Sequence, residues 1–277
     1  MAITQNLPSQ SVVSRAPGLG ATWLHRPWSA KLSLPNGLDF WLPSDQVRPA
    51  ARYLIREIFG RRRYFRENFQ IRSGDTVLDI GANMGLFTLW AAPQACEGRV
   101  VAVEPGRVID CLTYNVRANR LGNVTAVPVA VGNDGSRLEL IEYPGFNLVS
   151  HPSGMGPALL TRWLILLRYF HVQTPTVRRS APCQSLGTLM DEYGLRTVNF
   201  LKVDCEGAEY EMFRTLAPEH WKRIERVAME FHELRPGDRH GELVSLFQSH
   251  GFRVAIRKPL FEYYFLRFGE LWAWRET

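Results

Sequence analysis

The sequence predicts an α/β fold built on a doubly wound, mostly parallel, seven-stranded sheet with a C-terminal antiparallel hairpin. The first observation is an apolar run, Val77–Ile80, that contains one acid and ends at Gly81. A short turn reaches Gly85, and residues 86–92 are then typical of a buried helix. A strand, a glycine-rich turn and a helix form the opening unit of such a sheet.

The second observation is that strand-like and helix-like segments alternate along the chain. The expected strands are 76–80, 100–103, 124–131, 198–204 and 226–232, and the expected helices are 108–120, 208–216 and 241–250. Strands separated by helices form a parallel sheet with right-handed crossovers. The third observation is a pair of closing strands, 252–256 and 261–268, which we expect to form a hairpin joined near Lys258-Pro259.

Residues 1–70 are expected to precede the main domain as an arm, a hairpin and cap helices. The first 24 residues contain Ser, Pro and Gly without periodicity, which is typical of a loose arm. Residues 31–34 and 38–42 flank a Pro35-Asn36-Gly37 turn and predict a β-hairpin. Ser44 or Asp45 is placed to cap a helix that ends near Gly60, and a second short helix is expected over 63–69.

Composition places the chain among ordinary globular proteins. It has 277 residues, 45% of them hydrophobic and 22% charged, with a net charge of +6. Basic residues are scattered apart from Arg61-Arg62-Arg63, which we interpret as a solvated face rather than a nucleic-acid site. Four cysteines without a C-x-x-C pair, no signal peptide and no apolar stretch of membrane-spanning length are consistent with a cytoplasmic protein.

The residues around the glycine turn indicate a nucleoside-containing cofactor. Glu104-Pro105 follows the second strand, where an acid suits the two hydroxyls of a ribose. Asp79 stands where a dinucleotide fingerprint has its first glycine, and Asn83 adds a polar side chain to the turn. An acid at that position repels a pyrophosphate and suits a cationic amino-acid ligand.

This turn resembles motif I of class I S-adenosylmethionine (SAM) methyltransferases. Lys202-Val203-Asp204-Cys205-Glu206-Gly207-Ala208-Glu209 resembles the K-x-D-x-E-G-x-E signature of FkbM-type methyltransferases, and Glu230-Phe231-His232 resembles their E-x-H segment. The resemblance covers residues 74–252, although Asp191 falls one residue later than the family's T-L-D-like segment predicts. It implies a Rossmann-like methyltransferase domain over 71–277 and, for most members, O-methylation of natural products or sugars.

The resemblance and the strand ends together define candidate site residues. The expected cofactor-binding residues are Asp79, Gly81, Ala82, Asn83, Gly85, Glu104, Pro105, Asn119 and Asp204. The expected catalytic residues are His232, Asp204, Glu206 and Glu230. His232 is the preferred proton acceptor because histidine titrates near neutrality, and Asp204 is the competing candidate. A divalent cation held by these carboxylates, with magnesium favoured by oxygen ligands, is a less favoured alternative.

A long insert, residues 135–186, interrupts the expected sheet without a regular pattern. Within it, Pro157–Phe170 predicts a mostly apolar helix. Three roles stay open for this helix: packing on the core, covering an apolar acceptor, or contacting a second subunit or a membrane surface.

The expected function is SAM-dependent methylation of a hydroxyl on a small natural product, sugar or lipid-like acceptor. The alternatives are N- or C-methylation, nucleic-acid methylation by the basic surface, or a non-catalytic SAM-fold binding protein. The acidic and histidine residues at the strand ends argue against the last alternative. The sequence leaves the acceptor, metal dependence and oligomeric state open.

Overall fold

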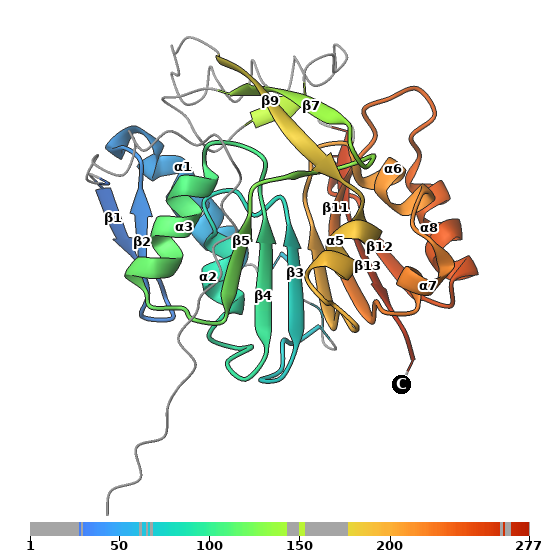
Figure 1. The fold of residues 1–277 in the computed structure, drawn as a ribbon, viewed down its shortest axis with the longest axis horizontal. Helices are drawn as coiled ribbons and strands as arrows, with labels where there is room; N and C mark the ends of the chain where they lie inside the picture. The colour runs from blue at the N-terminus through green and yellow to red at the C-terminus, as the bar shows by residue number, and fades with distance from the viewer. Residues whose placement is uncertain are drawn as a thin grey trace, which may run out of the picture.

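The structure is a computed structural model that describes residues 28, 30–60, 63–64, 66, 69–142, 150–152, 177–260, 263 and 267–276. Its centre is a seven-stranded sheet in the order β12-β13-β11-β10-β3-β4-β5 (Figure 1). The strands are β3 (Thr76–Ile80), β4 (Arg99–Val103), β5 (Val124–Val127), β10 (Phe200–Val203), β11 (Arg226–His232), β12 (Arg253–Arg257) and β13 (Phe268–Trp274). β13 runs antiparallel to both β11 and β12, which confirms the predicted mostly parallel sheet with a C-terminal antiparallel hairpin.

Both faces of this sheet are covered, which explains why its strands are apolar almost throughout. Val77, Val100 and Phe200 pack in one core cluster with the N-terminal elements and with α2 (Leu86–Ala91). Their strand neighbours Leu78 and Leu201 pack on the other face. That face is covered by α5 (Leu186–Glu192), α6 (Glu209–Arg214), α7 (Pro218–Trp221) and α8 (His240–Ser249).

The N-terminal hairpin is attached to the sheet through α3 (Ile109–Ala118). Strands β1 (Ala30–Ser33) and β2 (Asp39–Leu42) pair in antiparallel fashion, as predicted. The turn η2 (Asp45–Val47), α1 (Arg48–Ile55) and the π-helical turn η3 (Arg56–Gly60) follow. Of the short helix predicted over 63–69, the structure describes residues 63, 64, 66 and 69, and none of these is helical.

A second sheet, in the order β6-β9-β7-β8, corrects two predictions. The strand predicted over 124–131 is divided into β5 and β6 (Ala130–Val131), because Pro128 lacks the amide that a continuing ladder needs. The insert predicted to be irregular contains β7 (Arg137–Glu142), β8 (Ser150–Pro152) and β9 (Val177–Gln184). The helix predicted over Pro157–Phe170 lies outside the described residues.

The second sheet lies at the carboxyl ends of the central strands (Figure 1). One contact fixes this position: the backbone amide of Arg107, just after β4, donates to Oε1 of Glu142 in β7 at 2.7 Å. In open α/β sheets this is the edge where ligands bind.

The last strand differs from its predicted position. It begins at Phe268, where the predicted strand 261–268 was to end, and lies between β11 and β12. Gly269 permits this insertion, because a Cβ atom there would lie 2.5 Å from the Phe231 ring. Within the described residues, no helix is long and apolar enough to cross a bilayer.

Candidate functional site

The β3–α2 turn is shaped by backbone conformations that favour glycine. Gly81 has φ +73° and Gly85 has φ +88°, and Asn83 between them also has a positive φ. A Cβ atom on Gly81 would lie 1.8 Å from the carbonyl oxygen of Asp204, and one on Gly85 would lie 3.0 Å from Leu112. Gly81 and Gly85 are among the residues that we expect to bind the cofactor. The structure shows a further reason for glycine at both positions, namely close packing within the chain.

The carboxylate of Glu104 closes the other side of this turn. It accepts hydrogen bonds from the backbone amides of Asn83 at 3.0 Å and Gly106 at 2.7 Å. Ala82, which is buried, ties the turn to β4 by donating to the carbonyl of Val103 at 3.0 Å. Burial raises the pKa of Glu104 to about 7, although the two amides lower it.

The expected SAM cofactor fits this environment. A ribose diol would give the buried carboxylate of Glu104 the donors that burial removes, and would stabilise its charged form. Pro105, half-buried beside it, belongs to the same strand end.

Asp79, which we expected to face a cationic part of the cofactor, has a charged partner within the chain. It is fully buried, accepts a hydrogen bond from Thr88 Oγ1 at 2.7 Å, and pairs with Lys202, whose Nζ lies 3.1 Å from Oδ1. Burial disfavours the lysine cation, but Asp79 and Asp204 outweigh that effect and raise the pKa of Lys202. The cation beside Asp79 is therefore part of the protein, and Asp79 supports the turn from beneath.

Asn119 lies at the wrong end of the sheet for the cofactor role that we predicted. It follows α3, which runs back from the carboxyl end of β4 to the amino end of β5. Its side chain accepts from the amide of Asp39 at 2.9 Å and donates to the carbonyls of Asp39 and Asn115. Asn119 therefore holds the N-terminal hairpin against α3.

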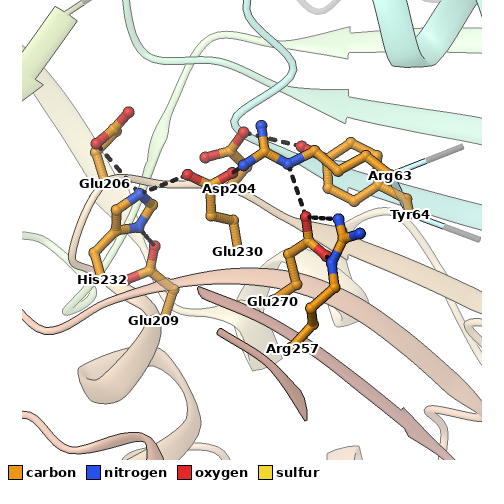
Figure 2. A network of polar contacts seen from close by, with 9 residues as sticks. All are labelled: Arg63, Tyr64, Asp204, Glu206, Glu209, Glu230, His232, Arg257 and Glu270. Carbon is orange, nitrogen blue, oxygen red and sulfur yellow. Dashed lines mark hydrogen bonds and ion pairs between the residues drawn. The ribbon is translucent and has the colours of Figure 1, made fainter. Parts of the chain in front are cut away.

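The four predicted catalytic residues come together at the ends of β10 and β11 (Figure 2). The fully buried His232 places Nε2 3.1 Å from Oε1 of Glu230 and 3.5 Å from Oε2 of Glu206. Its Nδ1 lies 2.9 Å from Oε1 of Glu209. Asp204 belongs to the same cluster, with one ligand-type atom each of Asp204, Glu230 and His232 lying within 4.8 Å of one another.

The charges in this cluster argue against His232 as the proton acceptor. Burial disfavours its imidazolium, but Glu206, Glu209 and Glu230 outweigh burial and raise the pKa of His232 well above 6.5. The raised pKa favours the protonated ring, which has no lone pair to accept a substrate proton. Burial, reinforced by Glu230, raises the pKa of Asp204 to about 6, which suits a carboxylate that accepts a proton near neutral pH.

Several residues of the site were not predicted. Tyr64 donates to Oδ2 of Asp204 at 3.1 Å, and Arg63 pairs with Glu230 at 2.7 Å and with Glu270 at 3.2 Å (Figure 2). Arg257 pairs with the same Glu270 at 2.6 Å. We had interpreted Arg63 as part of a solvated basic run, but its side chain is only 14% exposed.

Glu209 is a further residue of the site that was not among the predicted catalytic residues, and for it the sequence offers a signal, because it ends the Lys202–Glu209 motif. Its carboxylate accepts from the Gly207 amide at 3.2 Å and also contacts His232.

Comparison with known proteins gives a consistent result. A family model described as the methyltransferase FkbM domain matches residues 79–254, which span the glycine turn and the ends of β4, β10 and β11. The 31-O-demethyl-FK506 methyltransferase FkbM of Streptomyces tacrolimicus is 31% identical over 253 residues, covering 83% of this chain and 92% of that protein. Methyltransferase sdnD of Sordaria araneosa is 26% identical over 220 residues, covering 74% of this chain and 83% of that protein. The solved structure of methyltransferase FkbM from Methylobacillus flagellatus KT is 14% identical, covers 76% of this chain and 46% of that one, and has a TM-score of 0.47.

Proposed function

Because the chain belongs to the FkbM family of SAM-dependent methyltransferases, we propose that it methylates a hydroxyl group of a small natural product, sugar or lipid-like acceptor. The carboxylate of Asp204 carries this proposal. Asp204 directly follows β10, and its backbone carbonyl oxygen packs closely against Gly81 in the glycine turn. The name of the Streptomyces tacrolimicus relative, a 31-O-demethyl-FK506 methyltransferase, assigns methylation of an oxygen to that protein, which supports the same chemistry here.

SAM supplies a methyl group on a sulfonium, which is already activated for displacement. The chain's own task is therefore to align the acceptor and to remove its proton. Glu104 and the turn from Gly81 to Gly85 hold the cofactor from the β3–β4 side. Asp204 orients the acceptor hydroxyl and takes its proton.

Tyr64 and Lys202 keep Asp204 in its working state. The hydroxyl of Tyr64 fixes one carboxylate oxygen at 3.1 Å. Lys202 lowers the pKa of Asp204, opposing the effects of burial and of Glu230. A carboxylate with a pKa of about 6 is ionised at neutral pH and still basic enough to accept a proton from an alcohol as the methyl group transfers.

The experiment is mass spectrometry of candidate hydroxyl acceptors incubated with the protein and SAM. The expected result is the gain of one methylene on an oxygen atom of the acceptor. Asp204→Asn should lower kcat by about two to four orders of magnitude while SAM still binds. The matched control is Asp191→Asn, because Asp191 is exposed and pairs with His220 at 3.0 Å outside the site. Methylation on nitrogen or carbon, or an Asp204→Asn variant with full activity, would contradict the proposal.

A further inference from the structure

The cluster at the ends of β10 and β11 has the spacing of a metal site. One oxygen of Asp204, one oxygen of Glu230 and one ring nitrogen of His232 lie within 4.8 Å of one another. A cation with ligand bonds of about 2.1 Å holds adjacent ligands about 3 Å apart and opposite ligands about 4.2 Å apart. The 3.1 Å between Nε2 of His232 and Oε1 of Glu230 matches an adjacent pair. Small side-chain movements would therefore complete the set.

His232 is held in the orientation that a metal ligand requires. Its Nδ1 faces Oε1 of Glu209 at 2.9 Å, and both side chains are fully buried. Metal-binding histidines commonly donate from one ring nitrogen to a carboxylate, which fixes the ring and directs the other nitrogen at the metal. Nε2 of His232 is the nitrogen directed at Glu230 and Glu206 (Figure 2).

The charge of the cluster also favours a cation. The carboxylates drawn in Figure 2 belong to Asp204, Glu206, Glu209, Glu230 and Glu270. The cations among the residues drawn are Arg63, Arg257 and the protonated ring of His232, and a metal ion bound at Nε2 would replace the proton there. Arg63 engages Oε2 of Glu230, so that Oε1 is the oxygen presented to His232. The nearby Lys202 is committed to Asp79. A buried excess of carboxylates is costly unless a positive charge joins it.

We propose that Asp204, Glu230 and His232 bind one divalent transition-metal ion, with Glu209 as the outer partner of His232. The imidazole ligand distinguishes this set from the all-oxygen set that magnesium prefers and favours a transition-metal ion, and among these ions Mn²⁺ is the one that suits the two carboxylates. Glu206, whose side chain is 25% exposed, stands next to Nε2 and can add a further oxygen.

The inference concerns cation binding and does not require the acceptor to be a hydroxyl, although it extends the proposed function. A cation in this position would lower the pKa of a bound acceptor hydroxyl. With the cation bound, one carboxylate oxygen of Asp204 would be its ligand while Oδ2 keeps the hydrogen bond from Tyr64, and the cation would then assist the loss of the acceptor proton.

The test is a titration of the full, chelator-treated chain with Mn²⁺, followed by the loss of the free-ion signal in electron paramagnetic resonance. The expected result is one ion bound per chain. Asp204→Asn and Glu230→Gln should each weaken binding by at least tenfold, and Glu209→Gln by about 10- to 100-fold. His220→Gln is the matched control, because His220 pairs with Asp191 and packs on Gly187, away from the cluster, and should leave Mn²⁺ binding unchanged.

A second readout covers variants that fold poorly. Saturating Mn²⁺ should raise the Tm of the wild type, because a ligand that binds only the folded state stabilises it. It should raise the Tm of Glu230→Gln far less. The inference is overturned if the wild type binds no Mn²⁺ at about 1 mM, a concentration well above the Kd expected of a preformed protein site. It is also overturned if Asp204→Asn and Glu230→Gln bind Mn²⁺ as tightly as the wild type. Methyl transfer by a chain that binds no Mn²⁺ would overturn this inference alone, whereas Mn²⁺ binding without transfer to a hydroxyl would contradict only the proposed function.

Discussion

Lys202 and Asp79 form a buried ion pair beneath the β3–α2 turn, with Nζ 3.1 Å from Oδ1. The same Nζ donates to the backbone carbonyls of Ile80 at 3.2 Å and Gly81 at 2.8 Å. A single side chain of β10 thus fixes both the acid of β3 and the start of the turn. The pair therefore links the end of β10, next to Asp204, to the end of β3 at the glycine turn.

This arrangement predicts strongly non-additive mutations. Lys202→Met should destabilise the protein by about 3–5 kcal/mol, because it leaves the charge of Asp79 buried and unpaired. Asp79→Asn should cost a similar amount for the same reason, whereas the double variant should recover most of the loss. Urea unfolding of all four proteins measures the coupling. Additive losses would show that the two side chains act independently.

We predict that the stability of the cofactor-free protein depends on pH through Glu104. Its pKa rises from 4.5 to about 7 on folding, so the folded state binds the proton more tightly than the unfolded state. The stabilisation from this group is fully present below pH 4.5 and is lost as the pH rises through 7. The shift corresponds to about 3 kcal/mol. Thermal unfolding from acid to mildly alkaline pH should show this loss in the wild type and not in Glu104→Gln.

We also predict that Glu104 releases a proton when SAM binds. Hydroxyl donors favour the carboxylate form of Glu104, so SAM affinity should rise as the pH rises through 7. Calorimetry at about pH 6, in buffers with different ionisation enthalpies, measures the released proton. Binding that releases no proton in the wild type, or as much in Glu104→Gln, would remove Glu104 from the cofactor site.

Parts of the fold that depend on local pattern were predictable from the sequence. β3 and β11 have the bounds we predicted, because continuous apolar runs between polar turns are typical of strands buried on both faces. β7 and β9 were missed because they pair across about 40 residues and are partly exposed, so neither has a continuous apolar run. β13 was misplaced because its position depends on insertion between two distant strands.

The site shows the same division between local and distant information. The acids and the histidine at the strand ends were predictable because parallel strands bring their carboxyl ends to one edge. Arg63 and Tyr64 were not, because they reach Glu270 and Asp204 across 207 and 140 residues. The pKa of His232 was also not predictable, because it depends on three carboxylates that only the folded chain places around the ring.

We predict that replacing Asn119 lowers the stability of the protein without changing its affinity for the cofactor. Asn119→Ala removes the hydrogen bonds that hold Asp39 and leaves the hairpin's backbone groups without a partner. We expect a loss of about 1–3 kcal/mol in unfolding free energy and an unchanged SAM affinity. Glu104→Gln is the positive control for cofactor binding, because it should lower the SAM affinity without lowering the unfolding free energy. A clear drop in SAM affinity for folded Asn119→Ala would restore Asn119 to the cofactor site.

We predict that adding a single methyl group at Gly81 disrupts the whole site. Gly81→Ala would bring Cβ to 1.8 Å from the carbonyl oxygen of Asp204 in a backbone with φ +73°, so β3 and β10 would have to separate at their ends. Because that oxygen belongs to the backbone, no side-chain rotation relieves the contact. Gly122→Ala is the matched control, since no heavy atom lies within 4 Å of its Cβ position and its φ is not positive.

We therefore expect Gly81→Ala to lose SAM binding and methyl transfer together, and Gly122→Ala to keep both. Calorimetry with SAM and a methyl-transfer assay on the same preparations make the comparison. Transfer lost with SAM affinity retained would mean that the turn tolerates the methyl group and that only Asp204 has moved. Retention of both by Gly81→Ala would show that the ends of β3 and β10 do not need this close contact.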